Sequence, residues 1–349
     1  THVLTHGFTV DEQGRKMSKS LGNVVAPQKV ISTLGADVLR LWVASSDYSG
    51  EIAVSDNLLK RIADAYRRIR NTARYLLSNL SDFDPAKDRV ADHELLAVDV
   101  WALVQASKLQ DEIRAAYGEQ QFHQVYHKLH NYCVNDLGGL YLDVLKDRMY
   151  TLPAKSLARR SGQTAMFHIA AAMVRWIAPI LSFTADEIWQ LLPGDRSQSV
   201  FAQTWHKFPP LAETSVDWLR LTQTRECVKK MLEELRADGQ IGSSLNGEVS
   251  LFADRMVSSA LREVGDELRF WLITSEANVR ALEERSTNAV AVPLPDGEPL
   301  WIEALPSKHP KCDRCWHQRA DVGTHAAHPA LCGRCVENIA GAGEIRRYI

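Results

Sequence analysis

Apolar residues recur at helical spacing through the centre of the chain. Between residues 58 and 80 they stand three or four positions apart, at Leu58, Ile62, Tyr66, Ile69, Ala73, Leu76 and Leu80. The same period marks 94–117, 122–145 and 155–178. Such spacing places apolar side chains on one face of a helix. Five consecutive helices, counting one that restarts after Pro179, predict an α-helical bundle.

The restart after Pro179 has a capping pattern. Thr184 is followed three residues later by Glu187, an arrangement in which the hydroxyl caps the first turn of a helix. We therefore expect the fifth helix to begin at Thr184 and to run toward Leu192.

Beyond Pro210 the pattern changes from long helices to shorter, mixed elements. The expected helices lie near 217–237 and 258–266, and the expected strands near 249–253, 269–274 and 290–294. Apolar and polar residues alternate in the first of these strands, as they do in a half-buried strand. The sequence therefore predicts a small α/β module after the bundle.

Near its start the chain carries Lys16-Met17-Ser18-Lys19-Ser20, which puts two cations and two hydroxyls on a short stretch. A turn pattern precedes it at 11–15, and Leu21-Gly22-Asn23 interrupts any helix after it. A mobile loop with two lysines can close over the phosphates of a nucleotide, because lysine supplies a compact, flexible positive charge. The competing interpretation is a solvated basic turn.

The charge of the chain is distributed unevenly. The net charge is −2 and the pI is near 6.6, values that alone argue against a nucleic-acid partner. However, residues 58–80 carry six basic side chains against the single acid Asp64, and 155–175 carry four basic side chains and no acid. Basic helix faces are typical of proteins that follow a phosphate backbone, although a charged run is also ordinary on a solvated helix.

Two Cys-x-x-Cys pairs mark the last part of the chain. Cys312 and Cys315 form the first pair, Cys332 and Cys335 form the second, and sixteen residues separate the pairs. This spacing is typical of a four-thiolate zinc site, and a site closed by four cysteines is structural rather than catalytic. Two disulfides are an alternative that an intracellular setting disfavours. The histidines that could replace one thiolate are His309, His317, His325 and His328.

A second possible metal site lies on the stretch 122–145. His123 and His127 stand one helical turn apart and His130 follows, but no glutamate occupies the place where a zinc protease needs its base. We expect these histidines to be polar residues of the helix surface or residues close to a nucleic-acid partner.

The pentapeptide resembles the signature loop of class I aminoacyl-tRNA synthetases. Thr5-His6-Gly7-Phe8-Thr9-Val10-Asp11 before it and Gly22-Asn23-Val24-Val25 after it narrow the resemblance. Gly35-Ala36-Asp37 is shared with the valyl and leucyl relatives, whereas residues 39–56 are similar to isoleucyl-tRNA synthetases of the bacterial type. The resemblance extends nearly to the C-terminus.

The resemblance implies roles for the loop residues. In that family the second lysine of the loop, here Lys19, contacts the ATP phosphates and stabilises the transition state of adenylate formation, and Lys16 would assist. Ser18 and Ser20 are further candidates for binding the phosphates, although serines in a turn often bond only their own backbone. The implied substrates are ATP with Mg, L-isoleucine and tRNA(Ile).

The resemblance also implies that the bundle and the terminal zinc module bind the anticodon region of the tRNA. A ribbon that presents arginines and an aromatic residue suits stacking on an unpaired base. Arg314 and Trp316 are the specific candidates, with packing of Trp316 against its own knuckle as the alternative.

The expected fold is multidomain and mainly α-helical, with one structural zinc ion. Its four parts are the end of a Rossmann-type catalytic domain with the lysine loop (1–57), a helical anticodon-binding domain (58–210), a small α/β junction domain (211–305) and a four-cysteine zinc-binding domain (306–349).

Two functions compete for this chain. The first is isoleucine–tRNA ligase activity in protein biosynthesis, and the second is tRNA binding without any chemistry. The family's other signature, His-Ile-Gly-His, and the editing domain do not occur here, so we expect the C-terminal portion of a longer enzyme. No stretch approaches the roughly 18 apolar residues of a membrane span, and no export signal opens the chain. We expect a cytoplasmic monomer without a membrane partner.

Overall fold

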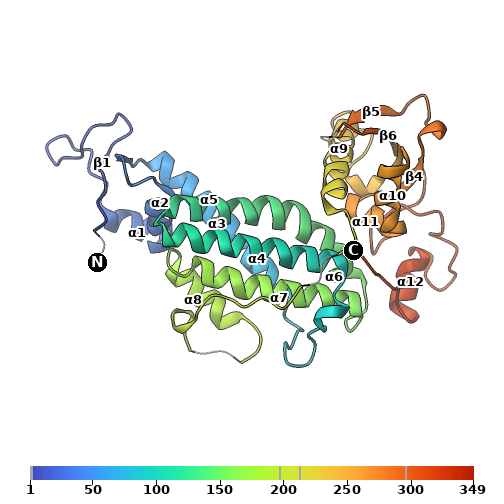
Figure 1. The fold of residues 1–349 in the computed structure, drawn as a ribbon, viewed down its shortest axis with the longest axis horizontal. Helices are drawn as coiled ribbons and strands as arrows, with labels where there is room; N and C mark the ends of the chain where they lie inside the picture. The colour runs from blue at the N-terminus through green and yellow to red at the C-terminus, as the bar shows by residue number, and fades with distance from the viewer. Residues whose placement is uncertain (1–2, 196–197, 212–213, 295–296) are drawn as a thin grey trace. The chain divides into compact units, whose positions relative to one another are not determined.

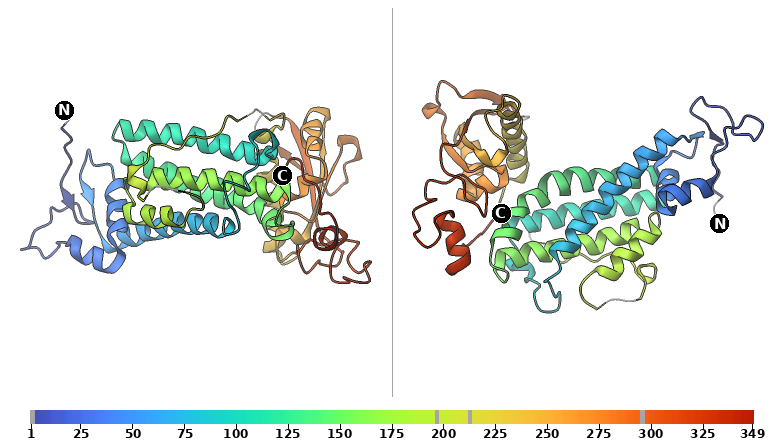
Figure 2. Two further views of the ribbon diagram at one scale, coloured as in Figure 1. Left: turned by 90° about the horizontal axis from the view of Figure 1, so that it is seen from below. Right: turned by 180° about the vertical axis from the view of Figure 1, so that it is seen from behind.

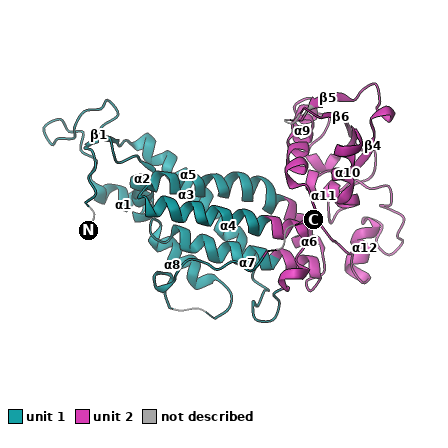
Figure 3. Ribbon diagram, viewed as in Figure 1, with its two compact units in different colours: residues 1–89, 102–143, 163–210 teal, residues 90–101, 144–162, 211–349 magenta. Residues whose placement is uncertain are grey.

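The computed structural model describes residues 3–195, 198–211, 214–294 and 297–349 of this chain. They group into two compact units, which Figure 3 shows in different colours. The first unit comprises residues 1–89, 102–143 and 163–210, and the second comprises residues 90–101, 144–162 and 211–349. The division into four domains that the sequence suggests stays a prediction.

The first unit contains most of a helical bundle. Its long helices run side by side in Figure 1 and Figure 2, namely α3 (Asp56–Asn79), α4 (Ala97–Gly118), α5 (Phe122–Asn131) and α7 (Leu157–Ile177). The periodic apolar positions of α3 are buried, with Ile69 and Leu76 both fully inaccessible to solvent. The predicted α-helical bundle is therefore confirmed.

The stretch 122–145 is not one continuous α-helix. α5 ends at Asn131, a π-helical segment η2 follows over Tyr132–Tyr141, and α6 covers Leu142–Thr151. In a π-turn each residue approaches the carbonyl five positions earlier. A Cβ on Gly138 or Gly139 would lie only 3.0 or 3.2 Å from that oxygen, so glycine suits both positions. The apolar period alone does not distinguish this wider turn from an α-turn.

Helix α8 (Ser182–Leu191) begins earlier than the sequence indicates, and its cap is not local. Thr184 lies inside the first turn, where its backbone N–H and its hydroxyl donate to Oδ2 of Asp37 at 2.7 and 2.6 Å. Asp37 belongs to α2 (Ala36–Ser45) and is buried. The prediction of Thr184 as the N-cap was wrong, because a carboxylate 147 residues away in sequence satisfies these donors.

Arg40 of α2 supports the other side of the same helix break. Its Nε donates to the carbonyl of Ile180 and its Nη2 donates to the carbonyl of Pro179, both at 2.7 Å. Carbonyls at the end of a helix have no partner within the helix, and the guanidinium supplies one. Asp37 and Arg40 together fix the junction of α7 and α8.

The second unit contains a four-stranded sheet with the strand order β4-β3-β6-β5. The strands are β3 (Gly247–Ala253), β4 (Glu276–Ala281), β5 (Val290–Pro293) and β6 (Pro299–Pro306). β3 is parallel to β4 and antiparallel to β6, which is antiparallel to β5. The helices of this module are α9 (Trp218–Ala237), α10 (Arg255–Glu263) and α11 (Leu268–Leu272). The predicted α/β module is present.

One strand prediction in this module was wrong. The stretch 269–274 contains helix α11 instead, and the strand parallel to β3 is β4. Phe270, Trp271 and Leu272 are all buried. A short apolar run that is buried on every side fits either a helix or a strand, so its composition does not decide between them.

The remaining elements are short. The other helices are α1 (Pro27–Leu34) and α12 (Gly333–Ala340), and a two-stranded sheet pairs β1 (Thr9–Val10) with β2 (Ile52–Ala53). Single 3-10 turns occupy Asp92–Glu94, Val200–Ala202, Ser244–Asn246, Gly265–Glu267 and Leu282–Glu284. Among the described residues, no helix combines the length and the apolar character that crossing a membrane requires.

Replacing Asp37 should destabilise the first unit. Asp37→Ala leaves the backbone N–H and the hydroxyl of Thr184 buried without their acceptor, so we expect a loss of about 2–3 kcal/mol in the free energy of unfolding. The matched control is Glu187→Ala, which breaks a half-exposed ion pair with Arg70 and should cost less than about 1 kcal/mol. Urea denaturation measures both. Equal losses would contradict the capping role of Asp37.

Candidate metal centre and lysine loop

The lysine loop starts where strand β1 ends. A turn follows at once, in which the amide of Gly14 donates to the carbonyl of Asp11 at 3.0 Å. Gly14 has a φ of +71°, a conformation that favours glycine. Residues 17–23 then consist of turns and irregular backbone. The prediction of a loop is confirmed.

Asp11 and Asn23 shape this loop. The Asp11 carboxylate accepts hydrogen bonds from the backbone N–H groups of Gln13 and Arg15, from the Arg15 guanidinium and from the Asn23 amide, at 2.9–3.0 Å. The Asn23 side-chain oxygen accepts from the N–H of Ser18 at 2.9 Å. The bonds from Asn23 and Arg15 hold the pKa of Asp11 well below its usual range. The sequence signals the loop-shaping role of Asp11 and Asn23 only weakly, because aspartate and asparagine side chains often bond to nearby backbone groups.

Met17 anchors the centre of the loop. Its half-buried side chain packs against an apolar cluster formed by Val25, Val30, Leu34, Leu39, Trp42, Val54 and Leu59. These residues come from α1, α2, α3 and the segments next to them. The apolar contact therefore fixes the loop in the middle, while the lysines on either side of Met17 are exposed.

The two lysines differ in their surroundings. Nζ of Lys16 lies 4.2 Å from the centre of the Phe8 ring, a cation–π contact. Lys19 is exposed, and none of the described residues forms a hydrogen bond or an ion pair with its amine. The Ser18 hydroxyl accepts from the N–H of Leu21 at 3.2 Å and lies 3.1 Å from the Ser20 hydroxyl. Lys19 thus offers a positive charge to solvent, whereas Ser18 is engaged in its own turn.

Helix α3 carries an exposed basic face. Its exposed cations are Lys60, Arg61, Arg67, Arg68 and Arg74. Arg70 is the exception, because its guanidinium donates two hydrogen bonds of 2.7 Å to Glu187 of α8. Arg67 also pairs with Asp64 on its own helix. The face retains a surplus of positive charge, as the sequence predicts.

The stretch 155–175 does not form a second basic face. Arg160 is buried, and the half-buried Arg159 donates to the carbonyl of Ala154 at 3.0 Å. Arg175 stacks over the Trp189 ring at 4.8 Å. These arginines belong to the interior of the bundle, because α7 is buried on nearly all sides. A count of charges does not reveal that burial.

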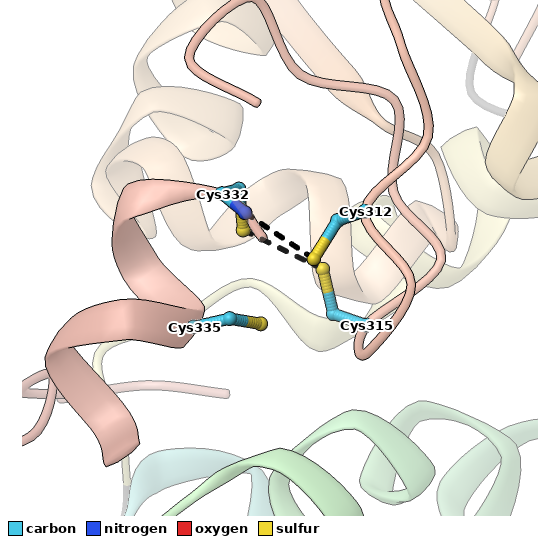
Figure 4. Close-up of side chains that lie close together, drawn as sticks. All are labelled: Cys312, Cys315, Cys332 and Cys335. Atoms are coloured by element: carbon cyan, nitrogen blue, oxygen red, sulfur yellow. Dashed lines mark hydrogen bonds between the residues drawn. The ribbon is translucent and has the colours of Figure 1, made fainter. Parts of the chain in front are cut away.

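The four cysteines form a cluster, which Figure 4 shows in close-up. Their sulfurs all lie within 4.8 Å of one another, and all four residues are buried. Sγ of Cys315 and Sγ of Cys332 are 3.7 Å apart, and the N–H of Cys332 donates to Sγ of Cys312 at 3.3 Å. All four are free cysteines rather than disulfide partners. Among the described residues, they are the only His, Cys, Asp or Glu group that is arranged to hold a metal ion.

These residues fit a structural zinc ion. Zn²⁺ takes four thiolates in a tetrahedron, and a complete thiolate set leaves no position for water. The second pair is placed by α12, because Cys332 is its N-cap residue and Cys335 lies in its first turn. None of the candidate histidines belongs to the cluster. His123, His127 and His130 form no metal cluster either, and His130 instead stacks with Tyr126 at 5.9 Å.

Asp147 of α6 bonds to the zinc module. Its carboxylate accepts hydrogen bonds from Arg334 at 2.7 Å and from Arg346 at 2.6 Å. Glu344 accepts from the same two arginines at 2.9 and 3.1 Å. Burial would raise the pKa of Asp147, but the two arginines hold it well below the usual range. Arg334 and Arg346 are therefore internal residues and do not contribute to a basic surface.

The last residues of the chain are bound by a second carboxylate. Glu267 accepts from three consecutive backbone N–H groups, those of Arg347, Tyr348 and Ile349, at 2.7–2.9 Å. The carbonyl of Tyr348 accepts from the N–H of Val98 at 2.8 Å. The terminal segment is thus held on both sides within the second unit.

Trp316 and Arg314 lie at the surface of the first knuckle. Trp316 is 60% exposed and has a φ of +65°, which is unusual for a residue other than glycine. Nζ of Lys311 lies 5.2 Å from the centre of its ring. Arg314 is exposed, with Nη2 donating to the carbonyl of Thr151 at 3.3 Å. Both side chains remain accessible to a ligand.

Removing the metal should loosen the zinc module selectively. We expect a chelator, or Cys332→Ser, to release the zinc and to speed amide exchange over residues 310–340, because that segment has little other core. The helices of the first unit keep their own buried core and should be unaffected. Metal analysis and hydrogen exchange measure the two effects. Cys227→Ser, at a half-buried thiol outside the cluster, is the control and should retain the zinc.

Three family models match this chain. Residues 1–55 match tRNA synthetases class I (I, L, M and V), residues 99–251 match the anticodon-binding domain of tRNA ligase, and residues 310–338 match the zinc finger found in FPG and IleRS. The last match contains all four clustered cysteines.

Curated relatives match nearly the whole chain. An isoleucine–tRNA ligase of Halorhodospira halophila is 57% identical over 99% of this chain, and one of Thioalkalivibrio sulfidiphilus is 56% identical over 99%. The chain spans 37% of the length of each. A solved LeuRS–tRNA–LeuAMS complex of Agrobacterium radiobacter is 18% identical over 71% of this chain and 25% of the LeuRS chain, with a TM-score of 0.43. The chain belongs to the isoleucine–tRNA ligase family of class I tRNA synthetases.

Proposed function

We propose that this chain is the phosphate-handling and tRNA-binding part of an isoleucine–tRNA ligase. The complete enzyme would activate L-isoleucine with ATP and Mg to isoleucyl-adenylate and would transfer it to tRNA(Ile). One observation carries the proposal: an exposed cationic loop and a closed four-thiolate module occur on the same chain, each within a matching family segment.

The lysine loop would act on the phosphates of ATP. Negative charge increases on the phosphate oxygens as pyrophosphate leaves, and a nearby ammonium stabilises that change. Lys19 is the better placed group, because its amine is exposed and forms no bond to the described residues. Lys16 would assist from its position over Phe8. Ser20 is a weaker candidate, and Ser18 weaker still because its hydroxyl accepts a bond within the turn.

The tRNA would bind to the α3 basic face and to the first zinc knuckle. Exposed arginines and lysines attract the phosphate backbone and position it without reading the sequence. An exposed tryptophan beside an arginine suits stacking on a splayed base, so Trp316 and Arg314 are the proposed base contacts. The zinc ion would have no catalytic part, because a four-thiolate site leaves no open position.

A second candidate function is tRNA binding without activation. It is favoured by the absence of a His-Ile-Gly-His string from this sequence and by the 37% coverage of the relatives. For the chain by itself, we propose this narrower function. We also propose a cytoplasmic location, since the relatives' activity belongs to protein synthesis, and a monomeric state.

A binding and exchange experiment distinguishes the two functions. We expect the purified chain to bind tRNA(Ile) with an affinity that falls steeply with salt, and to catalyse no isoleucine-dependent exchange between ATP and pyrophosphate. Trp316→Ala should weaken binding roughly tenfold if the ring stacks on a base. Lys311→Ala, which removes only the neighbouring charge, is the control and should have a smaller effect. Robust exchange by the chain would contradict the narrower function.

Lys19→Ala should impair activation much more than tRNA binding. In the complete enzyme we expect adenylate formation to fall by roughly a hundredfold or more, because the ammonium acts only where charge develops. Binding of tRNA should change less than about twofold. Arg15→Ala is a suitable comparison, since Arg15 lies in the same turn but pairs with Asp11. Equal losses of activation and of tRNA binding would overturn the assigned role of Lys19.

A further inference from the structure

Four arginines gather beside the zinc module. The guanidinium carbons of Arg269, Arg334 and Arg346 lie 4.6, 5.1 and 3.3 Å from the centre of the Phe270 ring. Arg319 is close by, with Nη1 donating to the carbonyl of Ser275 at 3.3 Å. Burial and the positive charges of Arg319, Arg334 and Arg346 lower the pKa of Arg269, so these like charges act on one another. Such a cluster requires negative charge nearby.

Two of the four arginines already have carboxylate partners. Asp147 and Glu344 both accept hydrogen bonds from Arg334 and from Arg346. By contrast, Arg269 contacts an aromatic ring and Arg319 contacts a neutral carbonyl. Neither has a bonded carboxylate among the described residues. Neither guanidinium therefore has a hydrogen-bonded carboxylate, although the Asp266 carboxylate lies close enough to Arg269 to act on its charge.

A cavity of about 190 Å³ joins these two arginines to the metal centre. Its lining comprises three arginines, two of the clustered cysteines and two further polar residues: Arg269, Arg319, Arg334, Cys315, Cys332, His317 and Asp321. Zinc with four thiolates has a formal charge of two negative units. Asp321 adds another, and its Oδ1 is buried without a hydrogen-bond partner. The wall of the cavity thus carries Arg269 and Arg319 together with sulfur and carboxylate groups whose negative charge can balance them.

We propose that Arg269 and Arg319 are the counter-charges of the zinc–tetrathiolate centre. They would stabilise the four deprotonated sulfurs around the metal across the shared cavity, while Arg334 connects the second knuckle to Asp147. The inference rests on the zinc module of the proposed function, but on neither tRNA binding nor activation.

The competing occupant of the cavity is an inorganic or nucleic-acid phosphate. Three arginines would attract one, but it would also meet two thiolates and the Asp321 carboxylate. Because these negative groups in the cavity wall would repel a phosphate, they favour the counter-charge role over phosphate binding.

The counter-charge role also gives the metal a second structural effect. Without the metal, the four sulfurs are no longer held together beside Arg269 and Arg319, so the arrangement of charges around the second knuckle is lost. Arg334 lies between Cys332 and Cys335 and binds Asp147 of α6. Loss of zinc should therefore weaken the hold of α12 on α6, in addition to unfolding the knuckles.

Zinc affinity tests the proposal directly. The chain, loaded with zinc, is titrated against a chromophoric chelator as wild type and as Arg269→Gln, Arg319→Gln and Arg269→Lys. We expect each glutamine variant to bind zinc roughly tenfold more weakly, since a nearby positive charge is lost, and the lysine variant to stay within about threefold of wild type. The Co²⁺ absorption spectrum reports whether all four thiolates still ligate. Arg285→Gln, an exposed arginine stacked on Trp301, should leave the affinity unchanged.

Three results would overturn the assignment. The first is unchanged zinc affinity in both glutamine variants. The second is a zinc affinity of Arg269→Lys as low as that of Arg269→Gln. That result would attribute the lost affinity to the packing of the guanidinium on Phe270 rather than to its charge. The third is stoichiometric binding of inorganic phosphate to the zinc-loaded chain that Arg269→Gln abolishes. None of these measurements uses tRNA or ATP. A failure of the proposed enzyme function would therefore not change the zinc affinities, and a failure of the counter-charge role would not contradict the proposed enzyme function.

Discussion

The hydrogen bonds of the Asp147 carboxylate are the interactions that hold the zinc module and the terminal segment together. A buried carboxylate is costly unless it is paired and hydrogen-bonded, and Asp147 meets both conditions through Arg334 of the zinc module and Arg346 of the terminal segment. Residues from α6, α12 and the end of the chain are therefore held at one point. Because a zinc module is too small to build its own core, its position depends on such contacts as well as on its metal.

The first unit uses the same principle at the break between two helices. The ends of α7 and α8 present donors and acceptors that no helix can satisfy internally, and Asp37 and Arg40 of α2 supply their partners. The opposite side of α2 contributes Leu39 and Trp42 to the cluster that holds Met17. One short helix thus contacts both the bundle and the lysine loop. In the proposed function, rigid support of this kind would keep the lysines near their working position.

Much of this could be predicted from the chain alone. The spacing of apolar residues predicted the bundle helices, and the spacing of the two Cys-x-x-Cys pairs predicted the metal site. Both predictions were possible because these signals are local and recur at fixed intervals. Predictions failed where one local pattern fits two environments. Thr184 has the pattern of an N-cap, but its hydroxyl and N–H bond to Asp37 instead. The apolar run at 269–274 fits a buried helix as well as a strand. The arginines of 155–175 fit a basic surface by sequence, but α7 is largely buried.

By itself, the sequence determined which residues are the candidates for the chemistry: two lysines on a glycine-flanked turn, four thiols in two pairs, and a basic face on one helix. It did so because those residue types have few alternative uses at such spacings. The tertiary structure alone decided which charges are available. It paired Arg70 with Glu187 and bonded Arg334 and Arg346 to Asp147, and it left Lys19 and Trp316 exposed. Burial and pairing depend on residues distant in sequence, so no local pattern could reveal them.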